Sequence, residues 1–180
     1  MGTLRAKMTH FGLHAVDMKR MQDFYTTVLG LIVNDTGHSP RLNMDLVFMS
    51  ASPLNHHQIV LVSGRPDTSG FNPINQISFT VENLGELREV HDRALANGAT
   101  GMRTTSHGNA WSIYFKDPEG NTIEVYLDSP WYIPQPHGDP LDLSKSDEEI
   151  YRETEAVCRA DPGFMPVEAY QAKVAARLAG

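Results

Sequence analysis

Residues 9–30, THFGLHAVDMKRMQDFYTTVLG, predict a strand that leads directly into a helix. Along the strand the side chains alternate, so His10 and His14 share one face and apolar residues share the other. Asp17 suits a helix N-cap, apolar residues then recur at helical spacing, and Gly30 suits the helix C-terminus. The apolar strand face must pack against the helix, which leaves both histidines on the polar face. Such a face is either exposed to solvent or lines a cavity.

The same pattern recurs later in the chain. Three pairs of matching positions are each 66 residues apart: His10 and Gln76, Asp17 and Asn83, and Gln58 and Glu124. A duplicated unit of one strand, one helix and three strands explains this spacing better than chance does. We therefore predict an α+β fold of two βαβββ modules, at about residues 8–64 and 74–129, which form a curved, partly open mixed sheet around a central cavity. The matching polar positions would converge at the floor of that cavity: His10, Gln58, Gln76 and Glu124.

Hydrophobic runs and turn residues place the elements of each module. The first module is expected to have a helix at 18–29, strands at 10–16, 31–34, 46–50 and 58–63, and a loop at 35–43. The second is expected to have a helix between Asn83 and Gly98, strands at 75–81, 99–102, 111–115 and 122–127, and a tight turn at 117–120. Asn83 suits an N-cap, with Glu86 at the capping-box position.

Residues 1–129 are thus expected to form one domain, followed by a C-terminal arm at 130–180. Four prolines favour an extended start to this arm. A capping box at 146–149 predicts a helix to about Cys158, and a second helix is expected at 167–178. We expect the arm to pack over the sheet edge, close the cavity or reach a second subunit, because its aromatic residues require burial.

The composition excludes several classes of partner. A net charge of −7 and a pI near 5.5 leave no basic stripe for nucleic acid or an anionic membrane surface. The sequence also lacks a membrane-spanning run and the apolar segment of a signal peptide. Cys158 is the only cysteine, which rules out an intrachain disulfide and a cysteine zinc site. We therefore expect a cytoplasmic protein, and exposed sheet edges together with the arm favour a homodimer.

Glu124 has the sequence position that most suggests chemistry. Ile123 and Val125 point to the other face of the strand, so the carboxylate faces the interior, which is costly unless a cation, an arginine or a proton compensates its charge. His10 and Gln76 are its neighbours by the symmetry of the repeat, and an imidazole with a carboxylate is a common nucleus of a non-haem metal site. The alternative is a hydrogen-bonded polar core in which Glu124 pairs with a basic residue.

Three further side chains are candidates for acid/base work. Tyr114 lies in the strand expected to pair with that of Glu124, where a phenol can orient a substrate oxygen or donate a proton. Tyrosine is also common on plain sheet surfaces. His57 and His107 lie at strand ends, where histidines are usually ordinary surface residues. At the mouth of one cavity they become candidates, because imidazole changes charge near neutral pH.

The motifs together resemble the vicinal oxygen chelate superfamily of glyoxalases, bleomycin resistance proteins and extradiol dioxygenases. The resemblance covers about residues 8–129 and rests on HFGLHAVDM at the start, FYTTVLGL in the first helix and YFKDPEGNTIEVY in the last hairpin. Within the superfamily the chain most resembles single-domain relatives of type I extradiol dioxygenases, of the biphenyl-2,3-diol 1,2-dioxygenase type. The resemblance implies that it cleaves the ring of a small catechol-like aromatic diol with dioxygen.

In those enzymes two histidines and a glutamate hold iron(II). The resemblance implies that His10 and Glu124 are metal ligands, that His57 is the acid/base histidine and that Tyr114 orients the substrate. Tyr114 precedes the glutamate by ten residues, as in the family. His107 matches a further catalytic histidine if its loop is two residues shorter than usual.

Gln76 stands where the family has its second metal-binding histidine. An amide oxygen is a weaker, harder ligand than imidazole, so iron(II) should be held less tightly. The expected ligands are His10, Gln76 and Glu124, with iron(II) as the expected metal and manganese, nickel or zinc as alternatives. Glyoxalase I also uses a glutamine, but on its first strand with two glutamates, and Gln58 stands at the position of one of these. Two other functions therefore stay open: a non-redox isomerase or lyase of glyoxalase type, and a metal-free binding protein of bleomycin-resistance type.

Overall fold

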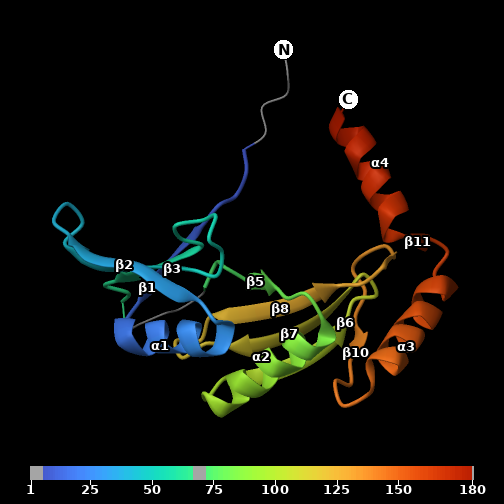
Figure 1. The fold of residues 1–180 in the computed structure, drawn as a ribbon, viewed down its shortest axis with the longest axis horizontal. Helices are drawn as coiled ribbons and strands as arrows, with labels where there is room; N and C mark the ends of the chain where they lie inside the picture. The colour runs from blue at the N-terminus through green and yellow to red at the C-terminus, as the bar shows by residue number, and fades with distance from the viewer. Residues whose placement is uncertain (1–5, 67–71, 180) are drawn as a thin grey trace. The chain divides into compact units, whose positions relative to one another are not determined.

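A computed structural model describes residues 6–66 and 72–179 (Figure 1). The chain divides into two compact units. One unit comprises Met1–Pro73 with Asp117–Asn121, and the other comprises Ile74–Lys116 with Thr122–Gly180. Each unit contains one mixed sheet and the helix of one βαβββ module, so the predicted α+β class and duplicated module are confirmed.

The first unit contains an open four-stranded sheet, in the described part of the chain, with strand order β1-β4-β3-β2. The elements are β1 (Phe11–Ala15), α1 (Met18–Leu29), β2 (Ile32–Ser39), β3 (Met44–Ser50) and β4 (Ile59–Ser63). The outer pair β1 and β4 is parallel, and the other pairs are antiparallel.

β2 is longer than predicted. The sequence favours a loop at 35–43, but β2 continues to Ser39 and pairs with β3 beyond a register shift between Val33 and Asp35. Most of β2 is exposed to solvent, so it lacks the apolar alternation by which a strand is recognised. Pairing with β3 supplies the backbone hydrogen bonds instead.

The predicted ends of α1 are confirmed. The side chain of Asp17 accepts a hydrogen bond from the backbone N–H of Arg20 at 3.0 Å, and Gly30 adopts φ 69° at the C-terminus. The helix buries four side chains against the sheet: Met21, Phe24, Tyr25 and Val28. Burying each such side chain stabilises the fold by roughly 1.5–3 kcal/mol.

The segment Asp117–Asn121 belongs to the first unit and contains the predicted tight turn. The backbone N–H of Gly120 donates to the Asp117 carbonyl oxygen at 3.0 Å. The buried Asp117 carboxylate also accepts from the Tyr25 hydroxyl at 3.2 Å and the Asn121 amide at 2.7 Å. Glu119 in turn accepts from Arg65 at 3.1 Å. The turn is therefore fixed by side chains of its own unit.

The second unit contains an open five-stranded sheet, among the described residues, with strand order β10-β6-β7-β8-β5. The module elements are β5 (Ile77–Thr80), α2 (Leu84–Ala96), β6 (Thr100–Ser106), β7 (Ala110–Lys116) and β8 (Thr122–Asp128). In Figure 1, α2 runs across one face of β7 and β8, the strands that it contacts. The Asn83 side chain accepts from the backbone N–H of Glu86 at 2.9 Å, which confirms the second N-cap.

The two modules differ by two residues in the pairing of their parallel strands. Phe11 lies opposite Ile59 in the first module, whereas Ile77 lies opposite Ile123 in the second. The separations are therefore 48 and 46 residues (59 − 11 and 123 − 77). The predicted equivalence of Gln58 and Glu124 is wrong by two residues. A shift of two keeps both side chains on the same face, because the strand period is two.

The C-terminal arm extends the sheet edge of the second unit, one of the placements expected for it. β10 (Asp139–Pro140) pairs with β6, and β9 (Trp131–Tyr132) pairs with β11 (Met165–Pro166). The helices that follow are α3 (Asp147–Ala160), with the predicted capping box at Ser146, and α4 (Val167–Ala179).

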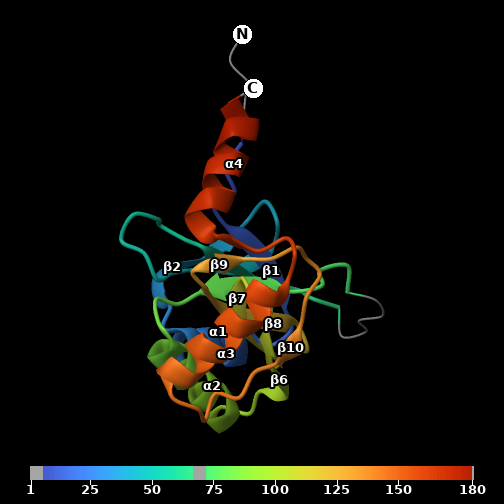
Figure 2. The same cartoon turned by 90° about the vertical axis from the view of Figure 1, so that its right-hand side faces the viewer.

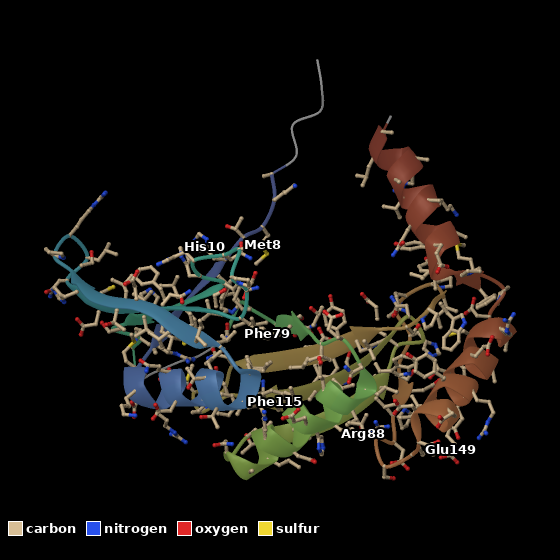
Figure 3. The ribbon with its side chains drawn as sticks, in the orientation of Figure 1. Met8, His10, Phe79, Arg88, Phe115 and Glu149 are labelled. Atoms are coloured by element: carbon tan, nitrogen blue, oxygen red, sulfur yellow. The ribbon has the colours of Figure 1, made fainter. Side chains whose placement is uncertain are left out.

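Arg88 of α2 anchors the start of α3. Its guanidinium donates to the carbonyl oxygens of Leu143 and Lys145 at 2.8 and 2.9 Å and to the Asp147 carboxylate at 2.7 Å. Figure 3 shows Arg88 pointing toward the end of α3 that carries Glu149. By contrast, Figures 1 and 2 both show α4 extending away from the five-stranded sheet, and no residue of α4 within its described range is buried. None of the described helices is long and apolar enough to cross a membrane.

Candidate functional site

Glu124 lies in the middle of β8, with its carboxylate in a shell of hydrogen-bond donors. The residue is only 8% exposed, and Ile123 and Val125 on either side of it are buried. Its Oε2 accepts from the Gln76 amide nitrogen and the Ser78 hydroxyl, both at 2.5 Å. These bonds satisfy one oxygen of a carboxylate whose burial would otherwise be costly.

Tyr114 connects Glu124 to His107. β7 and β8 pair with Tyr114 directly opposite Glu124, and the tyrosine hydroxyl donates to Glu124 Oε1 at 2.5 Å. The same hydroxyl lies 2.8 Å from His107 Nε2, and His107 Nδ1 lies 2.7 Å from the His137 carbonyl oxygen. Four predicted site residues thus form one hydrogen-bonded chain in the second unit: Gln76, Glu124, Tyr114 and His107.

This chain imposes a proton count. A carbonyl oxygen only accepts, so His107 Nδ1 carries a hydrogen and donates it to His137. The Tyr114 hydroxyl has one hydrogen but lies between Glu124 Oε1 and His107 Nε2. The contacts of the Tyr114 hydroxyl with Glu124 and with His107 are both hydrogen bonds only when these three side chains hold one additional proton, either on the His107 imidazole or on the Glu124 carboxylate. The arrangement can therefore pass a proton between Glu124 and His107 through Tyr114.

Tyr114 remains a phenol at neutral pH. The pKa of Tyr114 is raised to about 12. Burial is the largest cause, followed by the hydrogen bond to Glu124 and the negative charge of that carboxylate. The Arg103 guanidinium, 4.2 Å from the ring centroid, acts in the opposite direction. Tyr114 can therefore donate a hydrogen bond over the whole physiological range.

Gln76 presents its amide nitrogen, not its oxygen, to Glu124. Its Oε1 accepts from the Asn75 side chain at 3.1 Å. A carboxylate offers about four acceptor positions, of which Gln76, Ser78 and Tyr114 use three, so Glu124 retains one for a cation. No group of three or more His, Cys, Asp or Glu side chains in the described part of the chain is arranged to hold a metal. Because one acceptor position of Glu124 is free, the carboxylate can bind a divalent cation through a single oxygen. The Gln76 oxygen could become a second ligand after rotation of its carboxamide.

The first unit contains the other two predicted residues in ring contact. His10, labelled in Figure 3, immediately precedes β1, and its ring centroid lies 4.4 Å from that of His57. Burial lowers the pKa of His57, and the neighbouring His10 and His56 lower it further. His57 therefore favours its neutral form, which can accept a proton.

Two members of this cluster were not among the candidates drawn from the sequence. His56 lies between His57 and Asp35, with Nδ1 3.0 Å from His57 Nδ1 and Nε2 2.8 Å from Asp35 Oδ2. The adjacent histidines were visible in the sequence, but Asp35 falls where a loop was expected. Only the continuation of β2 brings it to His56.

Gln58 has a structural role at the end of β3. Its Oε1 accepts from the Ser50 hydroxyl at 3.1 Å and from the backbone N–H of Ala51 at 2.9 Å. This oxygen therefore stabilises the chain between β3 and β4. His14 lies apart from the histidine cluster, with Nδ1 3.3 Å from the Ser63 carbonyl oxygen.

The chain belongs to the glyoxalase/bleomycin resistance protein/dioxygenase superfamily, whose family model matches residues 7–125. The match spans both βαβββ modules up to Val125 and includes all six predicted site residues. This confirms the family resemblance seen in the sequence.

Curated relatives include two dioxygenases and a lyase. Biphenyl-2,3-diol 1,2-dioxygenases 2 and 3 of Rhodococcus globerulus are 27% and 26% identical over 71% of this chain, which spans 65% and 66% of their lengths. The chain therefore covers just under two thirds of these dioxygenases. Lactoylglutathione lyase of Salmonella typhimurium is 25% identical over 66% of this chain and 90% of the lyase.

Solved structures share the fold at lower identity. A glyoxylase/bleomycin resistance protein/dioxygenase domain from a Frankia species is 22% identical with a TM-score of 0.59, covering 70% of this chain and 100% of that domain. A fosfomycin resistance protein of Listeria monocytogenes, in complex with Mn(II) and sulfate, is 18% identical with a TM-score of 0.55 over 70% of this chain and 95% of that one. Glyoxalase I of Leishmania major has a TM-score of 0.56 at 20% identity, over 68% and 87% of the two chains.

Proposed function

We propose that this protein is a metal-dependent dioxygenase of the extradiol type, which cleaves the ring of a small catechol-like diol with dioxygen. The observation that carries the proposal is the buried Glu124 carboxylate, joined through the Tyr114 hydroxyl to His107. A buried carboxylate hydrogen-bonded to a tyrosine whose pKa is raised is typical of active sites. The similarity to biphenyl-diol dioxygenases supports the same class of substrate.

The metal in this proposal is iron(II), held by His10, Gln76 and Glu124. One imidazole nitrogen, one amide oxygen and one carboxylate oxygen suit a first-row divalent ion, although the amide makes the site weaker than one with a second histidine. When bound, such an ion would polarise the substrate oxygens and supply the redox chemistry for dioxygen. Manganese, nickel or zinc would each provide the first of these effects, and zinc, which has no redox chemistry, would provide that effect alone.

The remaining residues move protons. His57, which favours its neutral form, takes the proton from a substrate hydroxyl. Tyr114, which stays protonated, can donate its single hydroxyl hydrogen to a substrate oxygen in place of Glu124, and His107, when it carries a proton on Nε2, can donate in turn to the Tyr114 hydroxyl oxygen. Correctly placed acid/base groups of this kind contribute about 10²–10⁴ to a rate.

Product formation tests the proposal. The full chain is loaded with iron(II) under anaerobic conditions, its iron content is measured, and single-ring and two-ring catechols are then added in air. A yellow ring-opened product is expected with at least one diol. Iron-loaded protein that gives no product with any of them would contradict the proposal, as would equal rates with a redox-silent ion.

One observation favours a second function, a metal-free binding protein. The Gln76 amide nitrogen donates directly to Glu124, so the carboxylate is already partly satisfied. This alternative predicts no metal uptake and the same affinity for a small aromatic molecule with and without a chelator. Calorimetric titration in both conditions separates it from the enzyme.

We also propose that the chain works as a homodimer in the cytoplasm. The single buried cysteine needs no oxidising compartment, and α4, which has no buried residue in its described range, offers a surface for a second chain. Light scattering on the purified full chain gives the molar mass that tests the dimer. A mass equal to one chain at working concentration would contradict it.

A further inference from the structure

We infer that Asp35 and His56 are positioning residues that fix the tautomer of His57, with the proton on Nδ1 and a free lone pair on Nε2. The catalytic meaning of this inference rests on the proposed role of His57 as a base. The tautomer itself follows from hydrogen-bond geometry within the first unit.

The argument starts at Asp35. An ionised carboxylate only accepts hydrogen bonds, and Asp35 Oδ2 lies 2.8 Å from His56 Nε2. His56 must therefore carry a hydrogen on Nε2. In neutral imidazole only one nitrogen carries a hydrogen, so His56 Nδ1 is an acceptor.

The acceptor on His56 sets the proton position on His57. His56 Nδ1 lies 3.0 Å from His57 Nδ1, a normal hydrogen-bond distance. Because His56 accepts there, His57 must donate from Nδ1. Its Nε2 then carries the lone pair, which is the form required of a base.

Local structure holds the three side chains in this order. Asp35 lies opposite Phe48 at the register shift of β2, where a bulge re-aims side chains. The Phe48 ring centroid lies 5.8 Å from that of His56 and 5.3 Å from that of His57. The Asn34 amide also donates to the His56 carbonyl oxygen at 2.6 Å. Both imidazoles therefore contact the Phe48 ring, and the backbone of His56 is fixed by Asn34.

His56 cannot replace His57 as the base. Both of its ring nitrogens have partners, Asp35 and His57, so it has no free lone pair for a substrate proton. The Asp35 and His56 side chains are 68% and 53% exposed, so their pair adds little stability. Its effect is on the direction of the hydrogen bonds.

Nitrogen NMR of the imidazole rings tests the inference on the full, isotope-labelled chain, without metal and with diamagnetic zinc. The wild type should have His57 protonated on Nδ1, at a pH where the histidines are neutral. In Asp35→Ala, His56 is free to donate or to accept at Nδ1, so the His57 proton should be shared between Nδ1 and Nε2. The matched control is Asp45→Ala, because Asp45 makes a similar exposed contact of 2.9 Å with His38. It should leave the His57 signals unchanged.

An Nε2 proton on His57 in the wild type, or the same His57 tautomer in Asp35→Ala, would overturn the inference. If the protein has ring-cleaving activity, Asp35→Ala should also lower kcat about tenfold with little change in KM. A correct tautomer pattern in a protein without that activity would contradict the proposed function and leave this inference standing. The two claims therefore fail separately.

Discussion

The Tyr114 hydroxyl has one hydrogen and two acceptors within reach, Glu124 Oε1 and His107 Nε2. We predict that Tyr114→Phe lowers kcat of the proposed reaction about 10²-fold, because it removes a proton-transfer group and a substrate donor. KM should change much less. Steady-state kinetics with the best catechol would measure both values, with Tyr151→Phe on α3 as the control. An unchanged kcat in Tyr114→Phe would show that Tyr114 has no role in the reaction.

Gly108, in the loop that carries His107, allows a second prediction at this scale. It has φ 74°, and an added Cβ would lie 2.4 Å from Ile133 Cδ1. Gly108→Ala should therefore destabilise the fold by about 1–3 kcal/mol, through overpacking and backbone strain together. Gly120→Ala is the matched control, because it has φ 81° with no atom within 4 Å of the added Cβ. Chemical denaturation should give the larger loss for Gly108, and equal losses would contradict the clash.

Individual site residues differ in how far the sequence could identify them. Glu124 was recognisable because a carboxylate on the buried face of an apolar strand needs compensation. The donors that compensate it were not, since nothing in the sequence specifies that Gln76 turns its nitrogen toward Glu124. Asp35 was missed because its contact with His56 depends on a strand that lacks an apolar face.

Among the elements, the turn at Asp117–Asn121 contains a carboxyl group with a raised pKa, that of Asp117. Burial raises the pKa of Asp117 above its ordinary value of 3.8, although the hydrogen bonds from Asn121, Glu119 and Tyr25 oppose the shift. A raised folded-state pKa means that this group contributes its full stability below the unfolded value, and that the contribution is lost as the pH rises through the folded value.

We predict that Asp117→Asn destabilises the fold by about 1–3 kcal/mol, because an amide in place of Oδ2 would face the Tyr25 and Asn121 donors. The loss relative to wild type should be larger at acidic pH, below 3.8, than at neutral pH. Denaturation curves of both proteins at the two pH values give this difference. A loss of stability that is larger at neutral pH would mean that the hydrogen bonds outweigh burial and lower the pKa of Asp117, which would contradict this prediction.

The elements that the sequence predicted best are those with an apolar face and a cap. Both helices of the modules begin after their predicted N-caps, Asp17 and Asn83, which are 66 residues apart. β6 was predicted too short, because its last residues Thr104 to Ser106 are polar and are held by pairing with β7 and β10. Sequence pattern reports burial, and strands defined mainly by hydrogen bonds to neighbours leave little trace in it.

At the scale of the whole molecule, the duplicated pattern predicted the two modules, and the sequence motifs within them indicated the family. It did not predict the two-residue difference in strand pairing, because a shift of two leaves every side chain on the same face. The pairing of β10 with β6 was not predictable either. Only two residues form it, and one of them is Pro140.

The central claim is that Glu124 belongs to a metal site. Equilibrium dialysis of the full chain against iron(II) without oxygen, followed by metal analysis, tests it most directly, with the exposed Glu148→Gln as the control for Glu124→Gln. Wild type and Glu148→Gln should each retain about one ion per chain, and Glu124→Gln should retain almost none. A wild-type chain that retains no ion, or a Glu124→Gln chain that retains as much as wild type, would contradict the claim.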